Sequence, residues 1–184
     1  FTSSAGTGNV ISGNRESGVQ IQGAAATGNW VVSNLIGLTA DGASGLGNGK
    51  FGVLIFEAPR NFIGADNTDA GNVIAANGEV GVQIQGTHAT GNQVNNNLIG
   101  TNIEFSTSVG NTHNGILISD APANHIRFNT VSGNGLGIVI HASAANSTAA
   151  DNNDVSENHI GVVGAGSSLR GLPNFGSDAK AREL

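Results

Sequence analysis

Asparagine recurs in three columns along this chain, at a spacing that repeats from beginning to end. Segment 9–37 reappears at 72–100, an offset of 63 residues, with 20 of 29 positions identical. Each 63-residue unit divides into two shorter copies, and repetition at 20–50 residues indicates a solenoid or array. The three columns are Asn29, Asn61, Asn92, Asn124 and Asn146; Asn9, Asn34, Asn72, Asn97, Asn129 and Asn153; and Asn14, Asn48, Asn77, Asn111, Asn134 and Asn158.

Short β-branched segments lie between the columns. The shortest complete unit, Asn124 to Ala145, has 22 residues and three such segments, around Ile126, Val131 and 138–140. These segments are too short for helices and are bounded by Asn/Gly turn signals. Three strands and three corners per unit predict one rung of a triangular coil, and stacked rungs pair as parallel strands about 4.8 Å apart. We number the strands one, two and three after the asparagine column that precedes each.

Val and Ile then form inward columns that supply a core. Asparagine suits the corners because it tolerates the left-handed conformation, and its amide can hydrogen-bond from rung to rung. We expect strand one to contribute Val31, Ile63, Val94 and Ile126; strand two Ile11, Ile36, Ile74, Ile99, Val131 and Val155; and strand three Val19, Val53, Val82, Ile116, Ile138 and Val162, with Ile21, Ile55, Ile84, Ile118 and Ile140.

The repeat pattern resembles that of a known family. Asn-x-Val/Ile-x-x-Asn-x-Val/Ile-x-x-Asn-x-x-x-Gly-Val/Ile-x-Ile is similar to the right-handed parallel β-helix repeats of the pectate-lyase-like superfold, in particular to bacterial extracellular repeat proteins. The phrases GNVISGN at 8–14, SNLIG at 33–37 and NNLIG at 96–100 carry the resemblance, which spans roughly 8–165. It implies an all-β, single-stranded right-handed parallel β-helix of about six rungs, at an extracellular or cell-surface location. Such helices host enzymes, tailspikes and structural proteins, so function must be argued from a site.

Composition narrows the partners. The formal charge is −6 and the seven Lys and Arg residues are scattered, so no basic patch for nucleic acid is expected. There is no 18-residue apolar run, which argues against a membrane span. Without cysteine the chain has neither disulfides nor thiolate zinc sites. We expect no cofactor.

The repeat divides the chain at its C-terminal end. Residues 1–168 form the predicted coil, and residues 169–184 break every column. Open solenoid ends need covering, so we interpret this tail as a cap, with Leu172 and Phe175 over the last rung and a short helix after Asp178. A remnant of an expression tag is the alternative.

Three loops leave the coil, at 38–47, 64–71 and 101–110. The first and third lie in rungs whose strand three has outward apolar residues, Leu54 with Phe56, and Leu117. We expect those loops to fold over them. If they do not, the strand-three face is a candidate interface for a homo-oligomer.

The outward side of strand one is the strongest candidate for a binding surface. Its column runs Trp30, Phe62, Gln93 and His125, with Asn95 and Arg127 two positions further along their strands. Aromatic rings cover the C–H faces of sugars and amides bind hydroxyls, so the column predicts polysaccharide binding. In the alternative interpretation the two aromatic rings only pair across rungs for stability.

A second candidate site combines acids in the turn after strand three. Glu57 and Asp120 occupy equivalent positions 63 residues apart, and His88 lies in the same turn region. Two rungs separate them by about 9.6 Å, close to the roughly 6.5–9.5 Å between carboxyls of inverting glycosidases. These residues are candidates for acid/base catalysis by a hydrolase acting on polysaccharide or ester bonds. The alternative is two solvated turn acids repeated by duplication.

The loop at 64–71 contributes two further carboxylates. Asp66 and Asp69 could bind Ca²⁺, although the loop lacks a full set of hard ligands, so no metal site is predicted. Three hypotheses follow: a secreted module that binds polysaccharide through strand one, a hydrolase on the same scaffold, and a purely structural repeat of a surface protein.

Overall fold

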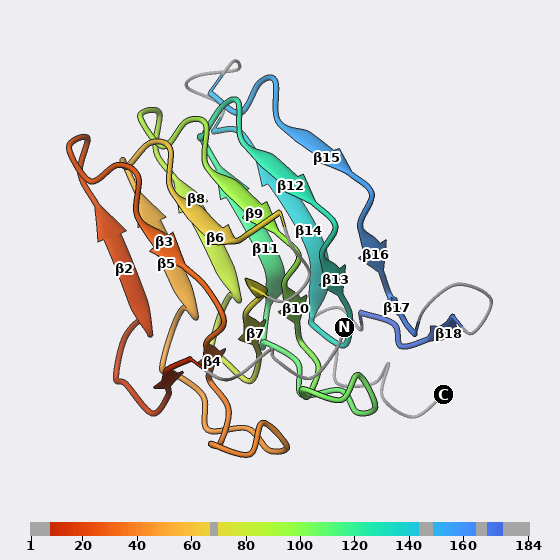
Figure 1. Ribbon diagram of the computed structural model, residues 1–184. Coiled ribbons are helices and arrows are strands. Elements are labelled where there is room, and N and C mark those ends of the chain that lie inside the picture. Colours follow the sequence, from red (N-terminus) through yellow and green to blue (C-terminus); the bar gives the residue numbers. More distant parts are fainter. Residues whose placement is uncertain (1–7, 67–69, 144–148, 165–168, 175–184) are drawn as a thin grey trace.

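The chain folds into a parallel β-solenoid, in which successive turns stack along one axis (Figure 1). The computed structural model describes residues 8–66, 70–143, 149–164 and 169–174. Every named element in these residues is a β-strand, which confirms the predicted all-β parallel β-helix. The solenoid makes about four turns, slightly fewer than the six rungs expected.

Sheet A holds the second strand of each turn. Its six strands are parallel, and each side chain stacks on its equivalent in the next turn, as Ile36 does on Ile74. The strands are β1 (Val10–Ile11), β4 (Leu35–Ile36), β7 (Val73–Ile74), β10 (Leu98–Ile99), β13 (Thr130–Val131) and β16 (His159–Ile160).

Sheet B holds the third strand of each turn and has the longest elements. Its five strands pair in register, so that Val19, Val53 and Val82 form one inward column. The strands are β2 (Val19–Gln22), β5 (Val53–Phe56), β8 (Val82–Gln85), β11 (Asn114–Ser119) and β14 (Leu136–His141).

Sheet C holds the first strand of each turn and carries the predicted binding face. It is also five-stranded and parallel. The strands are β3 (Trp30–Val31), β6 (Phe62–Gly64), β9 (Gln93–Asn95), β12 (His125–Arg127) and β15 (Asp154–Ser156). Beyond the last turn, β17 (Val162–Val163) pairs antiparallel with β18 (Arg170–Gly171).

The predicted inward columns form the core in the middle turns. Ile74, Ile84, Ile99 and Ile126 are fully buried and belong to one apolar cluster that runs through the coil. Burial decreases at the C-terminal end, where Ile140 is 46% exposed because no further turn stacks on it in the described residues.

The asparagines form three hydrogen-bonded ladders, as predicted. At most steps one side-chain oxygen accepts two hydrogen bonds from the asparagine of the preceding turn. The Oδ1 atom of Asn97, for example, accepts from the backbone N and the Nδ2 of Asn72 at 3.0 and 2.9 Å. The Asn97 amide also donates to the carbonyls of Ile63 and Asn95, so the ladder satisfies corner groups that no strand pairs.

At several corners the left-handed residue is the one before a ladder asparagine. Arg60, Ala123 and Phe128 have φ of 56°, 56° and 59°, and each precedes a ladder residue. No ladder asparagine in the described residues has a positive φ, although Asn96 and Asn152, each directly before a ladder asparagine, do; the left-handed expectation is therefore wrong for the ladder asparagines themselves. The asparagine contributes its side-chain amide, which hydrogen-bonds the corner to the next turn.

The last turn differs from the predicted alignment. Asn153 bonds Asn124 and therefore continues the first ladder, Asn158 continues the second, and Asn174 continues the third. Asn153 and Asn158 were each predicted one column too late, and Asn174 was not predicted. Asn146, predicted for the first column, lies outside the described residues.

The inward residues of the last turn shift with the ladders. Val155 pairs with Ile126 in sheet C, and Ile160 takes the predicted place of Val155 beside Val131 in sheet A. Val162 pairs with Gly171 rather than with sheet B. The described part of the tail, 169–174, thus lies against the last turn. Leu172 is half-buried there, whereas Phe175 and the segment after Asp178 lie outside the described residues.

Loops 38–47 and 101–110 pack on the outward side of sheet A. Ile103, Phe105 and Val109 contact a second apolar cluster, made of Leu35, Leu38, Val73, Ala75 and Leu98. The loops also meet each other, because the Ile103 amide donates to the Gly42 carbonyl. The expectation that they cover sheet B is wrong: each loop turns back at a short antiparallel bridge, Leu38 to Gly45 or Thr101 to Ser108, over the sheet it has just left.

Among the described residues, no helix has the length and apolar character to cross a membrane.

Candidate functional site

One outward column of sheet C brings together five side chains, one from each of its five strands. The strand register places Trp30 beside Phe62, then Gln93, His125 and Asp154. The first four were predicted in this order. Because neighbouring strands lie about 4.8 Å apart, the column extends for roughly 19 Å along the solenoid axis.

The two aromatic residues at the start of the column stack on each other. Their ring centroids lie 4.2 Å apart and their planes differ by 13°. Each ring therefore covers one face of the other, which is the cross-rung pairing considered as the structural alternative. Trp30 remains 59% exposed, so its other face and its edge are open to solvent.

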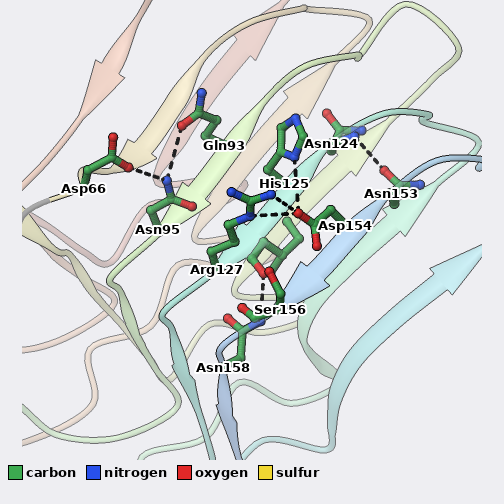
Figure 2. Close-up of polar contacts among 11 residues, drawn as sticks. Asp66, Gln93, Asn95, Asn124, His125, Arg127, Asn153, Asp154, Ser156 and Asn158 are labelled. Carbon is green, nitrogen blue, oxygen red and sulfur yellow. Dashed lines mark hydrogen bonds and ion pairs between the residues drawn. The ribbon is translucent and has the colours of Figure 1, made fainter.

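A second outward column runs beside the first, two residues further along each strand. It contains Gly64, Asn95, Arg127 and Ser156. Alternate residues of a strand point to the same face, which is why both columns share one surface. Asn95 links them: its Nδ2 donates to Asp66 Oδ1 at 2.9 Å and to Gln93 Oε1 at 3.3 Å (Figure 2).

A pocket of about 210 Å³ opens between the polar parts of the two columns. It is lined by Asp66, Gln93, Asn95, His125, Arg127 and Phe128. Four of the six predicted binding residues thus meet in one place, while Trp30 and Phe62 lie further along the column. Asp66 was predicted only as a weak calcium ligand, and Phe128 was not predicted.

Asn95 is the most buried polar side chain of the pocket, at 5% exposure. Its amide nitrogen has two acceptors, whereas its Oδ1 atom has no hydrogen-bond partner in the described residues. A buried acceptor without a donor costs free energy, on the order of 1–3 kcal/mol.

Asp154 completes the polar end of the site. Its Oδ2 atom accepts from Arg127 Nε at 2.8 Å and from Arg127 Nη2, and it lies 3.7 Å from His125 Nδ1 (Figure 2). The hydrogen bond from Arg127 is the main reason that the pKa of Asp154 lies below its usual value. Sequence reasoning missed Asp154, although it follows Asn153 as His125 follows Asn124.

The predicted acids Glu57 and Asp120 line one shallow depression of about 270 Å³, together with Gln85, Thr87 and Ser143 among others. Glu57 Oε2 accepts from the backbone N of His88 at 2.8 Å and lies 2.9 Å from His88 Nδ1. Asp120 Oδ1 accepts from the backbone N of Ser143 at 2.6 Å. All three predicted residues therefore belong to one region, although His88 does not line the depression.

These contacts give both acids the same local role. Each follows a sheet B strand in a left-handed corner, with φ of 52° at Glu57 and 50° at Asp120, and each carboxylate binds a backbone amide in the corner of the following turn. Glycine occupies the corner between them, where the φ of Gly86 is 98° and a Cβ would also meet the Glu57 carboxyl group. The carboxylates thus brace neighbouring turns.

The remaining predictions concern metal binding and assembly. Among the described residues, no group of three or more His, Asp or Glu side chains could hold a metal ion, and Asp69 lies outside those residues. The outward side of sheet B has the largest of these pockets, about 340 Å³, lined in part by Val80, Leu117 and Leu136. That this face forms a homo-oligomer stays a prediction.

No family model, curated protein or solved structure matches the chain.

Proposed function

We propose that the outward face of sheet C binds polysaccharide. The observation that carries the proposal is the pocket where Gln93, Asn95, His125 and Arg127 meet, polar side chains from two neighbouring strands of sheet C. Amide and carboxylate groups on a rigid sheet suit hydroxyl groups, because both donors and acceptors are held in place before the ligand arrives.

The aromatic end of the column supplies an apolar contact. The free face of Trp30 suits the C–H surface of a sugar ring, and its partner Phe62 holds the indole in position. The distance between this end and the polar pocket favours an extended chain over a single small sugar. The ligand in this proposal lies along the solenoid axis.

Affinity electrophoresis against a panel of soluble polysaccharides tests the proposal. Trp30→Ala and Gln93→Ala should each weaken retention by the gel that retards the native protein. Gln20→Ala is the matched control, since Gln20 is exposed on sheet B and bonds only Gln22 among the described residues. Equal retention of all four proteins would remove sheet C as the binding face.

A hydrolase remains the second candidate, because Glu57 and Asp120 line the same depression. If the protein cleaves a glycosidic or ester bond there, Glu57→Gln combined with Asp120→Asn should abolish turnover. Each change keeps a hydrogen-bond acceptor for the backbone amide of the next turn. Undiminished turnover in the double variant would exclude these acids as the catalytic pair.

We also propose an extracellular or cell-surface location. The resemblance to bacterial extracellular repeats and the exposed Asn, Thr, Ser and Gly residues support it, and an extended glycan ligand suits such a location. Fractionation of the source cells with an antibody against the protein tests it, and recovery from the cytoplasm alone would contradict it.

A structural repeat without a ligand would bind nothing in the polysaccharide panel.

A further inference from the structure

The only positive charge fixed in the sheet C pocket is already paired. Arg127 directs Nε and Nη2 at the same oxygen of Asp154, and the two side chains are 42% and 34% exposed. A guanidinium recognises an anionic ligand by directing two parallel N–H groups at it. Here two of those donors point at a carboxylate of the protein itself.

The other charges near the pocket are negative. Asp66 lines the pocket together with Arg127, and Asp154, which does not line it, pairs with Arg127. With histidine counted as neutral, Arg127, Asp66 and Asp154 contribute +1, −1 and −1, a sum of −1 at neutral pH. The whole chain carries −6, so the wider field opposes an anionic polymer as well.

The uncharged groups of the pocket suit hydroxyls. Gln93 and Asn95 present amides, and Asn95 Oδ1 lacks a donor among the described residues. Asp66 uses Oδ1 to hold the Asn95 amide, which fixes the orientation of that side chain. A chain of neutral sugars can satisfy these groups, whereas a chain of uronic acids would bring its carboxylates next to Asp66 and to a guanidinium whose Nε and Nη2 already bond Asp154.

We propose that Asp154 sets the charge class of the ligand, so that the sheet C face binds neutral polysaccharide and rejects polyuronates. This inference rests on the proposed function. Asp154 acts as a positioning residue: it withholds Arg127 from anionic groups and keeps the guanidinium against the wall of the pocket. Removal of its charge frees donors at the place where a ligand carboxylate would lie.

The test compares one polymer in two charge states. Affinity is measured for a neutral β-glucan that the native protein binds and for the carboxymethylated form of the same glucan, at low ionic strength. The native protein should bind the neutral form about tenfold more tightly or better, which corresponds to about 1.4 kcal/mol. Equal affinity, or a preference for the carboxymethylated form, would overturn the proposal.

Variants separate the role of Asp154 from a general change in charge. Asp154→Asn should raise affinity for the carboxymethylated glucan about fivefold or more, since charge-assisted hydrogen bonds are stronger than neutral ones, and high salt should remove the gain. Asp66→Asn is the matched control: it adds the same unit of charge but leaves Arg127 paired, so its gain should be clearly smaller. Equal gains from the two variants would reduce the effect to net charge and refute the role of Asp154.

Two further measurements cover the other outcomes. Asp154→Asn with Arg127→Gln should lose the gain, because no freed guanidinium remains. If Asp154→Asn does not fold, as a thermal melt would show, the comparison with the native protein still decides the charge preference. A native protein that binds neither glucan, nor any other polysaccharide of the panel, would refute the proposed function itself. A native protein that binds only polyuronates would refute this inference alone.

Discussion

The indole of Trp30 stacks on the ring of Phe62, with centroids 4.2 Å apart and planes inclined by 13°. The two residues are neighbours because consecutive turns of sheet C align them in register. Trp30 is the single tryptophan of the chain, so its fluorescence reports on this face alone. The stack leaves one face of Trp30 open on the same side of sheet C as the polar pocket.

Phe62→Ala should expose the covered face of Trp30. We expect a loss of about 0.5–1.5 kcal/mol in the free energy of unfolding, as for other aromatic pairs, and a red shift of the tryptophan emission. Leu46→Ala is the control, because Leu46 is apolar like Phe62 but is exposed and lies in the loop at 38–47. Unchanged emission in Phe62→Ala would mean that the rings do not stack in solution.

Asn97→Ala should be among the most damaging changes to the fold. Asn97 is fully buried, and its side chain bonds Asn72, Asn129 and the carbonyls of Ile63 and Asn95. Several groups would lose their partners at a cost of about 1–3 kcal/mol each, so we expect a total loss of at least about 3 kcal/mol. Chemical denaturation measures it, with Gln20→Ala as the surface control. A loss below about 1 kcal/mol would show that the ladder contributes little net stability.

Ile84→Ala and Gln83→Ala should differ sharply although the residues are adjacent. Ile84 is fully buried in the core, and its truncation should cost about 2–5 kcal/mol, as should that of Ile74 or Ile99. Gln83 points outward and bonds Gln85, so its loss should cost under about 1 kcal/mol, despite an exposure of only 8%. Thermal melts of the pair decide this, and similar losses would contradict the register of sheet B.

Deletion of loop 101–110 should lower the free energy of unfolding by more than the position of the loop suggests. The sequence alone favours a small effect, because the next turn closes with no loop at this place. In the structure Ile103 and Val109 cover Leu98 and Val73, which the deletion would expose to water. We therefore expect a loss comparable to a core truncation, about 2–5 kcal/mol, in urea denaturation. Near-native stability after the deletion would mean that the loop does not pack on sheet A.

The Asp154–Arg127 pair should make stability depend on pH in the acid range. The pKa of Asp154 lies below its usual value of 3.8, chiefly because Arg127 donates a hydrogen bond to the carboxylate. The contribution is complete above pH 3.8 and is lost as the pH falls through the lower pKa of the folded state. The stability difference between the native protein and Asp154→Asn should therefore shrink as the pH is lowered below this value. A difference that grows on acidification would mean that ionised Asp154 does not stabilise the fold through Arg127.

The double substitution checks that Arg127 is responsible. In an Arg127→Gln background, Asp154→Asn should change stability less than it does in the native protein, because the interaction is already absent. Equal changes in the two backgrounds would assign the acid dependence to another partner of Asp154.

The repeat predicts the middle turns correctly because the apolar pattern and the asparagine spacing indicate the same strand register there. One apolar residue follows each ladder asparagine of the first column at a fixed distance, as in Val31, Ile63, Val94 and Ile126. A strand can bury such a column on only one of its faces. The outward order from Trp30 to His125 then follows from the same register. The approximate location of the candidate site was therefore predictable, including the proximity of Asn95 and Arg127.

The contacts of the site depended on which asparagine joins which ladder. The spacing predicts Asn146 for the end of the first ladder and Asn153 for the second. In the structure Asn124 bonds Asn153 instead, and this pairing places Asp154 beside Arg127. Spacing alone cannot decide such a case, because loops of different length between turns leave the stacking of rungs unchanged.

The parallel coil, its inward columns and the order of side chains on each face follow from periodicity, so the amino-acid pattern predicts them for the middle turns. Contacts between distant segments set three other features: the loops cover sheet A, Glu57 and Asp120 bind backbone amides of the next turn, and Asp154 bonds Arg127. These contacts join side chains from different turns. No local sequence pattern predicts them, because they depend on hydrogen-bond geometry and apolar burial between distant segments.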